Sequence, residues 1–348
     1  MEEEPRSDQS PDTQSTVEKG GAGAEGLTML LCENPLPPID EAIAAAQEAV
    51  PASNHYTEPH SAPLRALLSE RLDIAEEHIH LNAGSELILR QLFDRYGEHV
   101  HLPTPTYPLF TEIAEEHTET RLRPEDDFAF DLRDLAIPDD ATLAVLVTPN
   151  NPNGTAVDLD PLPEFLDRHP DTMVLVDEAF GDFTDESVVP LVPAHDNLVV
   201  TRTLSKAHSL AGFRVGYAVA SRELVADLDA HNDAYPLARP SQAAAIATLQ
   251  NEEKIQDRVE RLRGWADDLA SELEDLGITT HPSETYFFLA DLAPHDSSDV
   301  ADALADRDIH VKPLDNPRLG PGYIRVTTGT PEENEVFLDA LSGILDGR

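Results

Sequence analysis

One lysine in this sequence, Lys206, has the surroundings of an amine nucleophile. It lies among small residues in the run TRTLSKA, residues 201–207, after an apolar stretch that predicts a β-strand, and Arg214 follows eight residues later. Such an amine can form a Schiff base with a carbonyl carbon, and a nearby guanidinium can bind a phosphate group. The other three lysines lie in an acidic leading segment, in a run of helix charges and after an edge-like strand: Lys19, Lys254 and Lys312.

Three further loops that follow predicted strands carry polar residues. Asp177 ends the apolar run VLVD, and a buried carboxylate is costly unless it meets a cation. Gly84 and Ser85 begin a predicted helix, whose free N–H groups and dipole can hold a phosphate, although the same pattern is also an ordinary helix cap. Asn151 lies in the turn PNNPNG and can donate a hydrogen bond into a crevice, or serve the turn alone.

The elements that must position these loops alternate as in an α/β protein. Short Val- and Leu-rich runs predict strands in a sheet covered on both faces by helices. Ligands bind such sheets at the carboxyl ends of the strands, so the four loops are expected to converge. Helices are predicted at 40–50, 61–72 and 84–96, and strands at 78–82, 99–103, 142–148, 173–177, 198–203 and 214–220.

The pattern changes after about residue 240. Two long helical stretches precede a strand at 285–291, a helix, strands at 309–312 and 323–328, and a last helix from Pro331. We therefore expect an acidic disordered extension over residues 1–26, a segment 27–45 that packs on a small domain, a large α/β domain over 46–240 with a mostly parallel central sheet, and a small α+β domain over 241–348.

The composition excludes several function classes. The formal charge of −43 opposes attraction to nucleic acid or to an anionic membrane surface. The acidic residues are spread along the chain, which favours a protein adapted to a high-salt cytoplasm, where molar salt screens self-repulsion. No apolar run of membrane-spanning length and no signal-type segment is present, and the single cysteine, Cys32, can form no internal disulfide.

Two His-x-His pairs, at His78 and His80 and at His99 and His101, are the nearest approach to a metal-binding pattern. Each pair would place two imidazoles on one strand face. Because no zinc-type Cys/His spacing accompanies them, we interpret them as polar strand ends and predict no metal site.

Three motifs together resemble the fold-type I, pyridoxal-phosphate (PLP) dependent class I/II aminotransferases, and among them the histidinol-phosphate aminotransferases. They are TLSKAxxLAGxR at 203–214, Asp-Glu-Ala-aromatic at 177–180 and the PNNPNG turn at 149–154. The resemblance extends from about Leu31 to the C-terminus. It implies an aspartate aminotransferase-like fold, PLP as the cofactor, and transfer of an amino group between an amino donor and a 2-oxo acid.

The resemblance also implies roles for individual residues. Lys206 would hold the cofactor and move the substrate proton, Asp177 would pair with the pyridine nitrogen, Asn151 would bond the phenolic oxygen, and Tyr107 would stack on the ring. Arg325 would clamp the substrate carboxylate. Substrate would also meet Asn34 and Lys312, and the cofactor phosphate would meet Gly84, Ser85, Thr203, Ser205 and Arg214, with Tyr56 reaching the phosphate of a neighbouring subunit in a homodimer with shared active sites.

Several positions depart from the family pattern near the substrate. Phe180 replaces a tyrosine, Tyr286 replaces an asparagine, and Lys312 replaces an arginine that helps bind the substrate phosphate. The Asp-Glu-Ala-Phe form is also similar to the threonine-phosphate decarboxylases, so decarboxylation of a phosphorylated amino acid is the alternative reaction. A non-catalytic, regulatory protein is disfavoured because Lys206, Asp177 and Arg214 are all retained.

Overall fold

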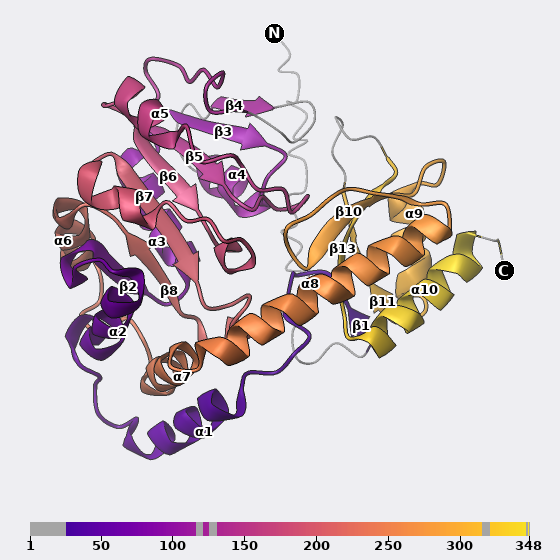
Figure 1. The fold of residues 1–348 in the computed structure, drawn as a ribbon, viewed down its shortest axis with the longest axis horizontal. Helices are drawn as coiled ribbons and strands as arrows, with labels where there is room; N and C mark the ends of the chain where they lie inside the picture. Colours follow the sequence, from indigo (N-terminus) through magenta and orange to yellow (C-terminus); the bar gives the residue numbers. More distant parts are fainter. Residues whose placement is uncertain (1–25, 116–120, 125–130, 315–320, 346, 348) are drawn as a thin grey trace, which may run out of the picture.

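The computed structural model describes residues 26–115, 121–124, 131–314, 321–345 and 347 of the 348-residue chain. The acidic extension expected over residues 1–26 lies outside the described residues, apart from Gly26. A seven-stranded sheet and a four-stranded sheet lie side by side, and a long helix, α8 (Glu252–Asp275), runs along both (Figure 1).

The larger sheet has the strand order β2-β8-β7-β6-β5-β3-β4. The five strands from β7 to β4 are parallel, and β8 runs antiparallel to both of its neighbours, β2 and β7. The sheet is therefore mixed but mostly parallel. Its strands are β2 (Ile79–Asn82), β3 (Val100–Thr104), β4 (Arg121–Pro124), β5 (Leu143–Val147), β6 (Met173–Asp177), β7 (Leu198–Thr203) and β8 (Gly216–Val219).

Helices cover both faces of this sheet because its central strands are apolar on both sides. In β5, Ala144 and Leu146 join one core cluster, whereas Leu143, Val145 and Val147 join the other. This alternation follows the two-residue period of a strand. The first cluster includes side chains from α1 (Asp40–Ala49), α2 (Ala62–Leu72), α5 (Leu162–Arg168) and α7 (Arg239–Leu249), and the second includes side chains from α3 (Ser85–Tyr96), α4 (Pro108–Glu115) and α6 (Arg222–Ala230).

The smaller sheet has the order β12-β13-β10-β9 and is antiparallel throughout. A third core cluster fills the space between this sheet and its helices. A separate parallel pair joins β1 to β11, so the start of the described chain lies on this smaller unit. The elements are β1 (Leu27–Thr28), β9 (Thr279–Thr280), β10 (Phe287–Asp291), β11 (Ile309–His310), β12 (Lys312–Pro313), β13 (Tyr323–Thr327), α9 (Ser297–Ala305) and α10 (Pro331–Leu345).

Short segments of 3₁₀ helix lie between these elements. One of them, at 211–213, ends at Arg214, whose φ of 52° is left-handed, so the strand predicted from residue 214 begins only at Gly216. The turns are η1 (Val50–Ala52), η2 (Pro59–Ser61), η3 (Glu76–His78), η4 (Gly181–Phe183), η5 (Val189–Ala194) and η6 (Ala211–Phe213).

Three sequence predictions need correction. The strand predicted at 309–312 is two short strands in different sheets, divided at Val311. The pair His78 and His80 does not share one strand face, because His78 belongs to a 3₁₀ turn. His80 is fully buried and hydrogen-bonded rather than a polar strand end, and His101 is also buried.

None of the described helices combines the length and apolar character that a membrane span requires.

Candidate active site

The loop between β2 and α3 meets the loop that carries Arg214. A Cβ atom on Gly84, whose φ is 88°, would lie 2.5 Å from Arg214 Nη2, so the guanidinium packs directly on this glycine. Gly216 is equally constrained, since a Cβ there would lie 2.2 Å from the Ser85 nitrogen. The first turn of α3 begins at Ser85, and the first N–H groups of a helix lack intrahelical acceptors. An arginine and a helix start therefore face the same point, which is the donor set of a phosphate site.

Lys206 is partly buried. Its Nζ donates to the carbonyl oxygens of Leu31 at 3.3 Å and Cys32 at 3.1 Å, and it lies 5.4 Å from the centre of the Phe180 ring. Burial lowers the pKa of Lys206, and the positive charges of Arg325 and Arg214 act in the same direction. A lowered pKa increases the fraction of neutral amine, which is the nucleophilic form.

Asp177 ends β6, next to β7, and only 4% of its surface is exposed. Burial raises its pKa from 3.8 to about 6, although a hydrogen bond from Thr201 Oγ1 to Asp177 Oδ1, 2.8 Å long, favours the ionised form. The neighbouring carboxylate of Glu178 raises the pKa further. The charge of the Asp177 carboxylate is therefore not fully compensated by its neighbours. A carboxylate in this state is suited to bind a cation.

Arg325 and Asn151 lie together on the side of the smaller sheet. Arg325 Nη1 donates to Asn151 Oδ1 at 2.7 Å, and Nη2 donates to the Leu30 carbonyl. Within the described part of the chain, Arg325 Nε is buried without a hydrogen-bond partner. Lys312 pairs with Arg325 across β12 and β13. The hydrogen bond between Arg325 and Asn151 therefore joins the small sheet to a turn of the large one.

The segment Leu30–Asn34, here called the strap, crosses the site between these groups. The carbonyls of Leu30, Leu31 and Cys32 accept hydrogen bonds from Arg325, Lys206 and Tyr286. Asn34 Nδ2 donates to the backbone oxygen of Lys206 at 3.0 Å. The amide of Asn34, predicted to meet substrate, therefore holds the lysine loop in this structure.

The predicted ring-stacking and phosphate side chains occupy different environments. Tyr107 is 41% exposed, packs edge-on against Phe110, and has a raised pKa because of burial of its hydroxyl and nearby carboxylates that include Asp177. Tyr56 is 79% exposed and stacks on Tyr235 with ring centres 4.6 Å apart. The two hydroxyl groups that were expected to meet the cofactor phosphate bond each other: Thr203 Oγ1 donates to Ser205 Oγ at 2.9 Å.

The two aromatic departures from the family pattern pack together beneath the lysine. The Phe180 ring lies 4.8 Å from that of Phe287 and 6.2 Å from that of Tyr286. Tyr286 is fully buried, and its hydroxyl donates to the Cys32 carbonyl. Sequence reasoning missed this use of Tyr286, and it also missed Thr201, which could have been found as the strand neighbour of Asp177.

Comparisons with known proteins agree with this geometry. The family model for aminotransferase class I and II matches residues 28–341. Histidinol-phosphate aminotransferase 2 of Gluconobacter oxydans is 34% identical over 337 residues, which cover 93% of each chain. The histidinol-phosphate aminotransferase of Acinetobacter baumannii is 30% identical over 321 residues, covering 89% of this chain and 88% of that relative.

Solved structures show the same fold. Histidinol-phosphate aminotransferase from Sinorhizobium meliloti, in complex with pyridoxal-5'-phosphate, matches with a TM-score of 0.83 and 22% identity over 92% of this chain and 91% of that one. L-threonine-O-3-phosphate decarboxylase from Porphyromonas gingivalis matches with a TM-score of 0.80 and 23% identity, over 92% and 99% of the two chains. The predicted aspartate aminotransferase-like fold is confirmed, and the chain belongs to the class I and II aminotransferase family.

Proposed function

We propose that this chain is a PLP-dependent aminotransferase that moves an amino group between an amino acid or amino-alcohol phosphate of the histidinol-phosphate type and a 2-oxo acid such as 2-oxoglutarate. The observation that carries the proposal is the convergence of three groups. A partly buried amine of lowered pKa, Lys206, a buried carboxylate of raised pKa, Asp177, and a guanidinium packed on a helix-start glycine, Arg214 on Gly84, come from neighbouring loops.

The residues present fit PLP. Arg214, Ser205, Thr203 and the first turn of α3 would hold its phosphate, Tyr107 would cover its ring, and Asn151 would bond its phenolic oxygen. Asp177 would keep the pyridine nitrogen protonated, and the cofactor would then act as an electron sink for bonds broken at the substrate α-carbon. A pyridinium cation would also offset the cost of burying the Asp177 charge.

The substrate would be oriented by the cations beside the strap. Arg325 would bind the α-carboxylate, or the corresponding end of an amino alcohol, and Lys312 would meet the substrate phosphate as a point charge. Lys206 would take the proton from the substrate α-carbon and deliver it to the carbon C4′ of the cofactor. The donor would leave as its oxo product before the 2-oxo acid enters, so that ping-pong kinetics are expected.

Decarboxylation of a phosphorylated amino acid is the second candidate. The specific observation in its favour is Phe180, whose ring packs against Phe287 and offers no hydrogen bond to the cofactor. This reaction would release carbon dioxide and would need no 2-oxo acid.

We also propose a cytoplasmic homodimer, adapted to high salt, with shared active sites. The exposure of Tyr56, whose backbone oxygen accepts a hydrogen bond from Arg239, supports a role for this side chain outside its own subunit. The formal charge of −43 supports the salt adaptation.

The reaction can be tested with purified protein in molar salt. Histidinol phosphate plus 2-oxoglutarate should yield glutamate, whereas threonine phosphate alone should yield no carbon dioxide. Carbon dioxide from threonine phosphate, without glutamate formation from any amino donor, would replace the transferase proposal with the decarboxylase one.

A further inference from the structure

Asn82, the last residue of β2, forms hydrogen bonds with the backbone of the loop that follows, Ala83–Ser85. Its side-chain Oδ1 accepts the Ala83 N–H at 2.8 Å, and its backbone oxygen accepts the Gly84 N–H, also at 2.8 Å. Both N–H groups ahead of α3 are thereby turned back toward the strand. The chain can then reverse at Gly84, with its φ of 88°, and present the start of α3 next to Arg214.

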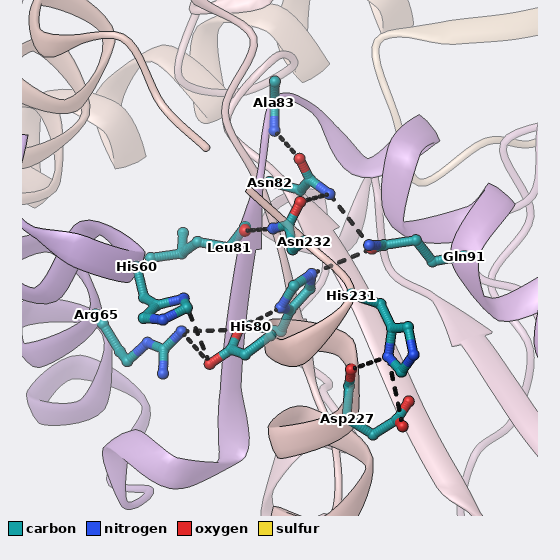
Figure 2. A network of polar contacts seen from close by, with 11 residues as sticks. His60, Arg65, His80, Leu81, Asn82, Ala83, Gln91, Asp227, His231 and Asn232 are labelled. Atoms are coloured by element: carbon teal, nitrogen blue, oxygen red, sulfur yellow. Dashed lines mark hydrogen bonds and ion pairs between the residues drawn. The ribbon is translucent and has the colours of Figure 1, made fainter. Parts of the chain in front are cut away.

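The Asn82 amide is itself held by two side chains from other elements. Its Nδ2 donates to Gln91 Oε1 at 3.3 Å, from α3, and to Asn232 Oδ1 at 3.2 Å, from the turn after α6. Asn232 Nδ2 in turn donates to the Leu81 carbonyl at 3.2 Å. Figure 2 shows this row of amides leading to Ala83.

Hydrogen-bond roles fix the direction of the whole row. The Ala83 N–H requires the oxygen of Asn82 to face it, so Asn82 presents its NH₂ group to Gln91 and Asn232. The oxygen of Gln91 therefore accepts, and it can accept a second hydrogen bond from His80 Nε2, 3.2 Å away, when both ring nitrogens of His80 carry a proton. No amide in the row can be reversed without placing two donors against each other.

The far end of the row is anchored in a partly buried ion-pair network. His80, which is fully buried, reaches Asp229 Oδ1 with its Nδ1 at 2.7 Å, and Arg65 binds the same carboxylate at 2.8 Å. Burial opposes ionisation of Asp229, but the hydrogen bonds of His80 and Arg65 outweigh it, and the pKa of Asp229 lies below its ordinary value. The row is thus tied to α2 and α6 rather than to mobile surface groups.

We propose that Asn82, held by Gln91 and Asn232, is a positioning residue for the cofactor phosphate: it sets the shape of the loop at Ala83–Ser85 and so the affinity for phosphate-bearing ligands. The proposal rests on the proposed PLP function. It assigns no contact between Asn82 and the cofactor, because the asparagine acts through the loop backbone. Among the residues that the structure describes, the buried Asn82 side chain makes only the hydrogen bonds of this row.

The test measures equilibrium binding of PLP and of pyridoxal, which lacks the phosphate, to the cofactor-free full-length protein. Asn82→Ala and Asn232→Ala remove the row at two points, and Asn232→Asp keeps the acceptor for Asn82 but loses the donor to the Leu81 carbonyl. His231→Ala is the matched control, because His231 neighbours Asn232, is largely exposed, and has a side chain that contacts Asp227 of α6 rather than the row. Thermal unfolding of each cofactor-free variant reports on general damage to the fold.

We expect Asn82→Ala to weaken PLP binding about tenfold while pyridoxal binding changes less than about twofold. Asn232→Ala should have a similar effect, the double variant should be no weaker than Asn82→Ala, and Asn232→Asp should bind PLP with an affinity between those of Asn232→Ala and the unaltered protein. Equal losses for PLP and pyridoxal, or unchanged PLP binding in Asn82→Ala, would overturn the inference while leaving the proposed function intact. Failure of the unaltered protein to bind PLP would remove both.

Discussion

Replacing Asp177 with asparagine should change the pH dependence of stability of the cofactor-free protein. The pKa of Asp177 is raised from 3.8 to about 6, chiefly by burial. Each pKa unit corresponds to about 1.36 kcal/mol, so ionisation of Asp177 costs the folded state roughly 3 kcal/mol. The folded state binds this proton more tightly than the unfolded state does, so the unaltered protein loses stability as pH rises from about 4 to 6.

Asparagine carries no proton that titrates in this range, so the variant lacks this loss. The free energy of unfolding of Asp177→Asn, minus that of the unaltered protein, should therefore rise by about 2.4 kcal/mol between pH 4 and pH 7 and stay level above. The constant part of this difference depends on how the amide meets the Thr201 hydroxyl, 2.8 Å from Asp177 Oδ1. Only the pH-dependent part tests the reasoning.

The assay is denaturant unfolding at constant high salt, at a series of pH values, on protein freed of cofactor. Other titrating groups are common to both proteins and cancel in the difference. Adding PLP should remove most of the pH-dependent difference, because a pyridinium cation favours the ionised carboxylate. A difference that stays flat from pH 4 to pH 7 would refute the account of Asp177 as a buried, uncompensated acid.

Three further predictions follow from the site and the surface. Arg325→Lys should raise the KM for the amino donor by about 10- to 100-fold with a smaller change in kcat, because a point charge replaces a fork of donors. A loss of that size in kcat with an unchanged KM would contradict the proposed binding of the substrate carboxylate by Arg325. Tyr286→Phe should lower the free energy of unfolding by about 1 kcal/mol, since it removes the hydrogen bond to the Cys32 carbonyl that holds the strap; unchanged urea unfolding would speak against that role. Transfer from molar salt to about 0.1 M salt should lower the Tm by several degrees, because self-repulsion at −43 is then poorly screened; a Tm independent of salt would exclude the salt adaptation.

The positions of the loops of the candidate site could be predicted because each follows a strand with a strong local signal. Val174–Asp177 is a continuous apolar run that ends in an acid, and the structure has it as part of a central parallel strand, β6. The helices α4 and α5 were not predicted, since eight and seven residues are too short for a helical period to stand out and prolines lie near their starts. The strand β4, with the sequence RLRP, carries no apolar pattern at all.

The contacts of the strap could not be predicted, because they join residues far apart in the sequence. The hydrogen bonds from Lys206 to Leu31 and Cys32 span more than 170 positions, and Cys32 has a left-handed φ of 49° without being glycine. The row of amides behind Ala83 is equally hidden, since Asn82 and Asn232 meet only after β2 and the turn following α6 are placed. Local sequence reveals neither pairing.

The central claim, that Lys206 holds PLP, is tested most directly by visible absorption. The unaltered protein, purified in molar salt and supplied with PLP, should show a band of protein-bound cofactor that bleaches with one amino donor and returns with 2-oxoglutarate. Lys206→Ala should lack that band, and thermal unfolding of the variant should show that it is folded. If the unaltered protein shows no cofactor band after reconstitution, or if Lys206→Ala shows the same band, the account is contradicted at its centre.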